Sequence, residues 1–177
     1  MREDIKITKV YRFEELSEEV QEETLARYFD LNVSFEWWEN VCEDAKTIGV
    51  GIESFDLDRG SDCRGKFLQD ELDVAENVLK DHGKDCETYT DAYEFVWDMA
   101  VAENEYRTDM QGADDENQVE FDAYYQRPEL LSDFQDTIFE DYRIILQKEY
   151  DYLTSEEAIR ETIDANEYEF TEDGRIY

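Results

Sequence analysis

The sequence predicts an α+β fold in which a small, mainly antiparallel sheet is packed by five or six helices. Hydrophobic residues make up 41% of the chain and aromatic residues 14%, which is more apolar material than acidic disordered chains carry. Alternating segments near both ends predict strands, and the segments between them repeat apolar residues at helical spacing. Because 177 residues fit one core, we expect a single domain over residues 1–177.

The amino-terminal segment predicts a strand followed by a two-sided helix. Ile5, Ile7, Tyr11 and Phe13 nearly keep a period of two, and Ser17 is placed to cap the helix. One face of this helix is expected to join the core: Leu16, Val20, Thr24, Tyr28 and Leu31. The opposite face is acidic: Glu15, Glu18, Glu19, Glu22 and Asp30. The pattern therefore indicates a buried side and a carboxylate-covered side.

The middle of the chain predicts a helix, a strand and a further helix. The first runs from about Phe35 to Ile48 and stops at Gly49. Val50, Ile52 and Phe55 then indicate a strand, and the polar run 58–62 is expected to be a loop leading to a helix. That helix contains Leu72, Ala75, Val78 and Leu79 and ends at Gly83.

The second half predicts three more helices and a hairpin. Thr88 or Thr90 is expected to cap a helix reaching Val101, and a loop over 112–116 follows. Pro128 begins a long helix, and its acidic face is formed by Glu129, Asp133, Asp136, Glu140 and Asp151. Thr154 or Ser155 starts a short helix, and residues 168–177 are expected to form a hairpin that turns at 172–174.

The dominant chemical property is negative charge. Fifty Asp and Glu residues face 17 Lys and Arg residues, which gives a formal net charge of −33. Each third of the chain carries an acidic excess, so the charge belongs to the whole domain and not to a tail. Such a surface repels phosphate and attracts basic partners.

The cysteines and the lengths of the apolar runs indicate the cellular compartment. No stretch approaches the roughly 18 or more apolar residues of a membrane span, and the amino end, 1–4, lacks the apolar run of a signal peptide. We expect a cytoplasmic protein. Cys42, Cys63 and Cys86 are odd in number and contain no C-x-x-C pair, which favours reduced thiols.

Catalytic signatures are weak. The sole histidine, His82, is expected near a helix end, where it favours capping. No nucleophile elbow, P-loop or dinucleotide motif accompanies it, so we expect no enzyme and no cofactor. Asp56, Asp58 and Asp62 have the spacing of a cation-binding loop. Since Ser61 stands where an EF-hand needs Gly, an Asx-type turn is favoured, and a metal-dependent enzyme or cation-binding protein remains an alternative.

The charge predicts an acidic protein that occupies the nucleic-acid-binding surface of a basic host protein. Its 33 net charges equal the charge on roughly 56 Å of duplex. The expected partner-binding residues are Glu15, Glu18, Glu19, Glu22, Asp30, Asp114, Asp115, Glu116, Asp133, Asp136, Glu140 and Asp151. We expect no direct nucleic-acid binding and no membrane binding. A salt-adapted acidic housekeeping protein and an acidic adaptor remain alternatives.

Three segments carry a resemblance. Residues 10–17, 36–39 and 55–61 resemble those of small acidic proteins encoded by bacteriophages and prophages. The resemblance covers mainly the first 65 residues and the carboxyl-terminal hairpin, and it implies a phage setting without a catalytic role. In size and charge the chain is also similar to acidic DNA-mimicking inhibitors of restriction and CRISPR systems, which implies a host defence protein as partner.

Overall fold

Local sequence signals form six α-helices and four short strands among the residues that the structure describes. The structure is a computed structural model that describes residues 8–58, 60–109 and 128–177. These residues form two compact units, and the second is inserted into the first. The first unit comprises Met1–Trp37 and Lys148–Tyr177, and the second comprises Trp38–Gln147. Each unit is described below by itself.

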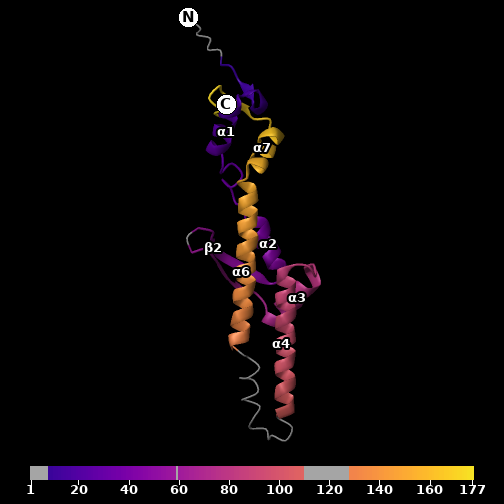
Figure 1. Cartoon of the computed structure of the whole chain (residues 1–177). Helices are drawn as coiled ribbons and strands as arrows, with labels where there is room; N and C mark the ends of the chain where they lie inside the picture. Colours follow the sequence, from indigo (N-terminus) through magenta and orange to yellow (C-terminus); the bar gives the residue numbers. More distant parts are fainter. Residues whose placement is uncertain (1–7, 59, 110–127) are drawn as a thin grey trace, which may run out of the picture. The chain divides into compact units, whose positions relative to one another are not determined.

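The first unit is formed by an amino-terminal and a carboxyl-terminal segment of the chain, which are indigo and orange to yellow in Figure 1. Strand β1 (Tyr11–Arg12) pairs antiparallel with β4 (Glu169–Phe170). A 3₁₀ helix, η1 (Phe13–Glu15), leads to α1 (Glu18–Arg27). The last residues of α6 (Pro128–Leu153) and all of α7 (Glu156–Ala165) complete this unit.

The core of the first unit joins residues that are distant in sequence. Its buried members are Phe13, Leu16, Leu25, Ile159, Ile163 and Phe170. The rings of Phe13 and Phe170 meet edge to face, with centroids 6.0 Å apart. Tyr28 Oη accepts a hydrogen bond from the backbone N–H of Ile176 at 3.0 Å, which holds the carboxyl-terminal hairpin against the turn after α1.

The second unit is built around a β-hairpin and four helical segments. Helix α2 (Glu39–Thr47) has Ile48 as its C-cap and is followed by Gly49, whose φ of 87° suits glycine. Strands β2 (Val50–Asp56) and β3 (Asp62–Phe67) pair antiparallel with an irregularity between Ile52 and Ser54. Helices α3 (Glu71–Asp81) and α4 (Glu87–Asp109) follow, and the first part of α6 returns to the hairpin.

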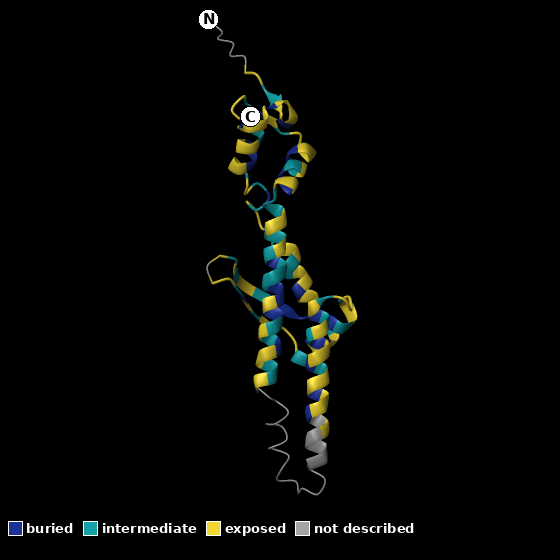
Figure 2. Ribbon diagram, viewed as in Figure 1, coloured by how far each residue is buried: buried dark blue, intermediate teal, exposed yellow. Residues whose placement is uncertain are grey.

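Aromatic rings fill the core of the second unit. Phe95 of α4 stacks on Phe134 of α6 with centroids 4.1 Å apart and planes 6° apart, and Phe67 of β3 contacts Phe134 and Phe139. Tyr142 is fully buried and donates a hydrogen bond from its hydroxyl to Asp44 Oδ2 at 3.1 Å. Figure 2 shows buried and exposed residues alternating along α4 and α6, so each helix has one side in the core.

The α+β class and the antiparallel pairing predicted from sequence are confirmed. The strands form two separate two-stranded sheets, β1–β4 and β2–β3. The cap of Ser155 on α7 is confirmed by its hydroxyl, which accepts from the N–H of Ala158 at 3.3 Å. The hairpin turn at 172–174 is confirmed too, and Gly174 adopts a φ of 71° there. The single-domain organisation over 1–177 stays a prediction.

Four expectations differ from the structure. Residues 62–67 form β3, where the sequence indicated only a loop before α3. Helix α4 begins at Glu87, so neither Thr88 nor Thr90 caps it, and the thiol of Cys86 accepts from the N–H of Tyr89 at 3.3 Å. Helix α1 ends at Arg27, which leaves Asp30 and Leu31 in the following turn. Helix α2 begins at Glu39 and not near Phe35. Ile5, Ile7 and the predicted loop at 112–116 lie outside the described residues.

Within the described ranges, no helix combines the length and the apolar character that crossing a membrane requires.

Candidate partner-binding surfaces

The acidic face of α1 is the densest row of exposed carboxylates that the sequence predicted. Glu18, Glu19, Glu22 and the neighbouring Glu23 are all exposed. They form two pairs at a spacing of four residues, so their carboxylates lie on adjacent stripes of one helix face. None of the ion pairs among the described residues involves them. Their charge is therefore directed to solvent.

Two predicted members of this face have a different setting. The carboxylate of Glu15 accepts a hydrogen bond from the backbone N–H of Arg12 at 2.8 Å, so it helps to begin η1. Asp30 is exposed in the turn after α1, where its carbonyl accepts from the N–H of Val33 at 3.0 Å. Both charges are exposed, but neither belongs to the α1 rows.

The acidic face of α6 is sparser than predicted. Asp133 and Asp136 are exposed in the second unit. Glu140 is held by Arg143, which donates two hydrogen bonds of 2.8 and 2.7 Å to its carboxylate. These bonds lower the pKa of Glu140 and offset its charge. Asp151 is exposed in the part of α6 that belongs to the first unit. Asp114, Asp115 and Glu116 lie outside the described residues.

The predicted cation loop is the turn of the β2–β3 hairpin. Asp56 Oδ1 accepts from the backbone N–H of Asp58 at 2.8 Å, which confirms an Asx-type turn. Asp62 forms an ion pair with Arg64, so two of the three carboxylates already have protein partners. In the part of the chain that the structure describes, no group of three or more His, Cys, Asp or Glu side chains has the arrangement of a metal site.

Sequence reasoning missed a pair of carboxyl groups between α4 and α6, the half-buried Asp91 and the buried Asp141. Asp141 is only 9% exposed, and its carboxyl group lies beside Thr88 and Asp91. Burial is the main cause that raises the pKa of Asp141 to about 6, and burial together with Glu94 also raises the pKa of Asp91. Asp141 lies three residues after the core residue Ile138, and that spacing was the available signal for a buried position.

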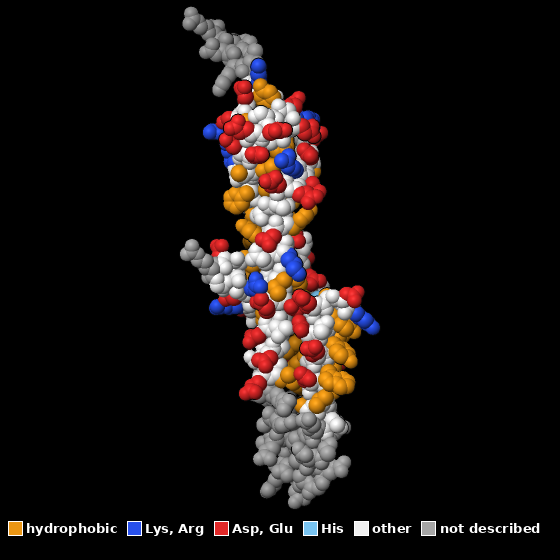
Figure 3. Space-filling model, viewed as in Figure 1, with side chains coloured by type: hydrophobic (Ala, Val, Ile, Leu, Met, Phe, Trp, Pro, Cys, Tyr) orange, Lys and Arg blue, Asp and Glu red, His pale blue; other side chains and the backbone are white. Residues whose placement is uncertain are grey.

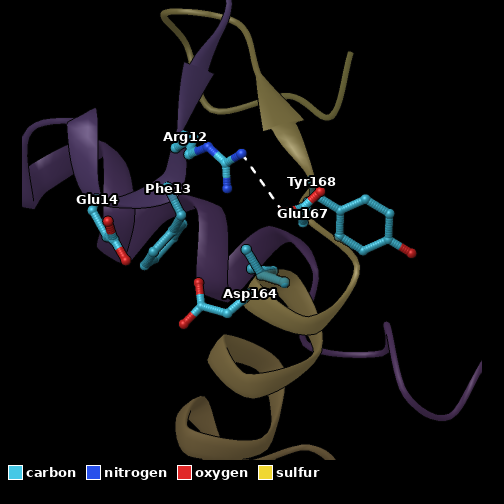
Figure 4. Close-up of a pocket in the computed structure, with 7 residues that line it drawn as sticks. Arg12, Phe13, Glu14, Asp164, Glu167 and Tyr168 are labelled. Atoms are coloured by element: carbon cyan, nitrogen blue, oxygen red, sulfur yellow. Dashed lines mark ion pairs between the residues drawn. The ribbon is translucent and has the colours of Figure 1, made fainter.

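A hollow of about 190 Å³ lies in the first unit between η1 and the end of α7. Figure 4 shows Arg12 reaching toward Glu167, with the two side chains 3.7 Å apart. The remaining lining residues are Phe13, Glu14, Ile163, Asp164 and Tyr168. The lining contains three carboxylates and one guanidinium, so the hollow adds to the acidic surface of this unit.

The outer side of α4 carries exposed apolar side chains. Tyr93 is 53% exposed, Trp97 60% and Val101 40%. Figure 3 shows hydrophobic side chains gathered along α4. Glu94 and Asp98 lie beside the aromatic rings, and a shallow hollow of about 300 Å³ is lined by Tyr93, Glu94, Trp97 and Asp98.

The sole histidine and a cysteine lie together between α3 and α4. His82 is the C-cap residue of α3, and its backbone N–H donates to the carbonyl of Val78 at 2.9 Å. Its Nδ1 atom is 3.8 Å from the sulfur of Cys86. The predicted place of His82 at a helix end is confirmed.

Comparison with protein-family models, with curated proteins and with solved structures gives no match to this chain.

Proposed function

We propose that this chain is an acidic inhibitor of phage type, acting in the host cytoplasm, that binds the basic nucleic-acid-binding surface of a host defence or regulatory protein. The observation that carries the proposal is the pair of exposed carboxylate rows on α1, formed by Glu18, Glu19, Glu22 and Glu23. They lie in a chain with a net charge of −33. A basic groove that binds phosphates is the complementary surface.

The density of these charges supports imitation of a duplex. Residues 18–23 span about 7.5 Å of helix axis at a rise of about 1.5 Å per residue. Four carboxylates over that length give about one charge per 2 Å, close to the one per about 1.7 Å of duplex DNA. In the part of α6 that belongs to the second unit, the predicted residues Asp133 and Asp136 remain after Arg143 has offset Glu140. The proposal therefore rests on the α1 face, and the α6 carboxylates add to the net negative charge of the chain.

The salt-adaptation alternative makes a different prediction. A carboxylate that serves only solubility is exchangeable with any other exposed carboxylate, because the net charge alone matters. Imitation of phosphates requires particular carboxylates at particular places, because the basic groups of a groove are fixed in position. Equal changes of net charge at two different places separate the two functions.

The test compares two variants that lose the same charge. One carries Glu18→Gln, Glu19→Gln, Glu22→Gln and Glu23→Gln on α1. The control changes four carboxylates that are also exposed, on α2 and α3: Glu39→Gln, Glu43→Gln, Asp73→Asn and Glu76→Gln. A partner is first identified by affinity capture, and its affinity for each protein is then measured against salt concentration. Circular dichroism checks that both variants stay folded.

We expect the α1 variant to bind at least tenfold more weakly and to show a shallower slope of log affinity against log salt. The control should stay near the parent, and excess duplex should displace the parent protein from its partner. Equal losses of affinity in the two variants would mean that only the net charge matters and that the positions of the carboxylates do not. If excess duplex fails to displace the protein from its partner, the partner's nucleic-acid groove is not the binding site.

A further inference from the structure

Helix α4 is apolar on two opposite sides. Its inner side carries the buried residues Thr88, Ala92, Phe95, Met99 and Ala102. At about 100° per residue, Trp97 lies about half a turn from the middle of that inner side, and Tyr93 and Val101 flank it. A surface helix of a folded domain normally has one apolar side, facing its own core. The second apolar side is therefore available to something other than the core of this unit.

The exposed stripe, Tyr93–Trp97–Val101, has the chemistry of a contact surface. Its side chains are 53%, 60% and 40% exposed, and they follow one another at every fourth residue along the helix. Tyrosine and tryptophan are enriched at interfaces, where their large rings leave water on binding. Contiguous exposed apolar residues with a polar border mark interaction sites in soluble proteins.

The border of the stripe determines the charge of its occupant. Glu94 and Asp98 follow Tyr93 and Trp97 by one residue each, so a carboxylate row runs beside the aromatic row. The hollow of about 300 Å³ is lined by these two rings and these two carboxylates. An aromatic face attracts a cation through its ring electrons, and a carboxylate next to it pairs with the same cation. Arginine fits both, because its planar guanidinium stacks on rings and donates to carboxylates.

We propose that the α4 stripe is a docking site for a basic amphipathic helix of the partner, whose apolar side chains cover Trp97 and whose arginine enters the hollow beside Glu94 and Asp98. The inference rests on the proposed function in one respect, which is that the partner is basic. It adds a contact that DNA does not make, since no phosphate gains from burying Tyr93 and Val101. The partner is thus recognised by apolar contact as well as by charge.

A second copy of this chain is the poorer occupant. Each copy has a net charge of −33, and two α4 stripes in contact would bring Glu94 and Asp98 of one copy to the same carboxylates of the other. Like charges at such a contact disfavour association. Charge complementarity therefore selects a basic partner over self-association.

The test uses designed peptides as probes of the whole protein. The probe is a 15-residue amphipathic peptide with leucines on one helical face and arginines along both borders of that face. One comparison peptide replaces every leucine by serine, and another replaces every arginine by lysine. Affinity is measured by calorimetry, and the indole N–H signals of the ¹⁵N-labelled protein report which tryptophan is contacted. The signal of Trp97 is assigned from its loss in Trp97→Phe.

We expect the leucine–arginine peptide to shift the Trp97 indole signal. Trp97→Ala should bind this peptide at least tenfold more weakly, and the pair Glu94→Gln, Asp98→Asn several-fold more weakly. The matched control is Phe35→Ala, which removes a 64% exposed ring from the first unit and should bind like the parent. The serine peptide should bind at least tenfold more weakly than the leucine peptide, and the lysine peptide should be intermediate.

Three results overturn the inference. The first is equal affinity of the parent and Trp97→Ala, and the second is equal affinity of the leucine and serine peptides. The third is a dimer in sedimentation analysis that Trp97→Ala dissociates, because the stripe would then be covered by a second copy. None of these results would contradict the proposal that the α1 carboxylates bind a basic surface. Likewise, a failure of duplex to displace the captured partner leaves the peptide measurements intact.

Discussion

The carboxyl group of Asp91 on α4 lies beside that of Asp141 on α6, and burial together with the charge of Asp91 raises the pKa of Asp141. Below about pH 6 Asp141 is protonated and can donate to Asp91, and above that pH both carboxylates are ionised and repel each other. The Thr88 hydroxyl also binds Asp141. One oxygen of Asp141, Oδ2, is nevertheless buried without a hydrogen-bond partner among the described residues. The α4–α6 contact therefore includes a polar group that burial disfavours when it is charged.

Replacing Asp141 by asparagine should remove a pH-dependent penalty from the second unit. The folded pKa of Asp141 is about 6, above its ordinary value of 3.8, so the folded state binds the proton more tightly than the unfolded state. The stabilisation from that proton is complete below about pH 4 and is lost as the pH rises through about 6. Asparagine donates to Asp91 at every pH. We expect Asp141→Asn to be about 1 kcal/mol more stable than the parent at pH 8 and equal to it near pH 4.

Hydrogen exchange of the α6 amides near residue 141 measures this difference locally. The matched control is Asp133→Asn, because Asp133 is exposed on the same helix. The difference in stability between Asp133→Asn and the parent should change little between pH 4 and pH 8. Parallel pH profiles for Asp141→Asn and the parent would contradict the raised pKa of Asp141.

Glycine at position 167 should stabilise the first unit. Glu167 has a φ of 52°, and it follows the C-cap residue of α7. The N–H of Tyr168 donates to the carbonyl of Ile163 at 3.1 Å and that of Glu167 to Asp164 at 3.1 Å, which is the Schellman pattern. A side chain in the left-handed region costs about 1 kcal/mol, so Glu167→Gly should gain about that amount. The exposed ion pair with Arg12 contributes little to offset this gain.

Urea denaturation followed by the circular dichroism signal compares Glu167→Gly with Glu161→Gly. Glu161 is exposed inside α7, where glycine should cost about 1 kcal/mol. The two substitutions should therefore move the midpoint in opposite directions. A shift in the same direction for both would exclude left-handed strain at position 167.

Alanine at position 65 should disrupt the β2–β3 hairpin. Gly65 lies opposite Ile52, and a Cβ atom added at Gly65 would collide with the backbone carbonyl oxygen of Gly51. Because backbone cannot rotate away as a side chain does, we expect Gly65→Ala to destabilise the second unit by about 2 kcal/mol or more. Gly83→Ala is the control, since no atom lies within 4 Å of a Cβ added there. Thermal denaturation should show a lower midpoint for Gly65→Ala alone, and equal midpoints would refute the close approach.

The three thiols should react with an alkylating reagent in a fixed order. Burial raises the pKa of Cys63 to about 11 and raises the pKa of Cys42 by less, so both thiolates are scarce at pH 8. Cys86 is half-buried beside His82 and the first turn of α4. We expect Cys86 to be alkylated first and Cys63 last, as peptide mass spectrometry would show. After denaturation without reductant all three should react, and a missing pair would reveal a disulfide.

Local signals in the sequence predicted those features that nearest neighbours determine. Ser155 precedes an apolar helical pattern, and Gly174 stands in a turn between two short apolar runs, so α7 and the carboxyl-terminal hairpin could be found without tertiary information. The α1 carboxylates likewise follow from helical spacing. Arg143, three residues after Glu140, was a readable signal that one acidic charge on α6 is offset.

Tertiary contacts determine the features that sequence reasoning missed. Strand β3 contains few residues with a strand preference, and it forms because its backbone pairs with β2. Asp91 and Asp141 are 50 positions apart along the chain, so no local pattern could bring them together. The periodicity of α4 shows apolar residues on both sides, but which side the core covers depends on where α6 packs. The sequence alone therefore could not show that Trp97 lies on the exposed side of α4.

Because the second unit is inserted into the first, the two halves of the first unit's core are synthesised at different times. Phe13, Leu16 and Leu25 pack against Ile159, Ile163 and Phe170, yet residues 38–147 are translated between the two groups. At about 5–20 residues per second, the amino-terminal half-core waits on the order of ten seconds for its partners. During that interval the ribosome-bound chain can complete the hairpin and α2–α4, while Phe13 and its neighbours stay available to chaperones. The acidic residues beside them, Glu14, Glu15, Glu18 and Glu19, have the flanking position of charges that limit aggregation of exposed apolar segments.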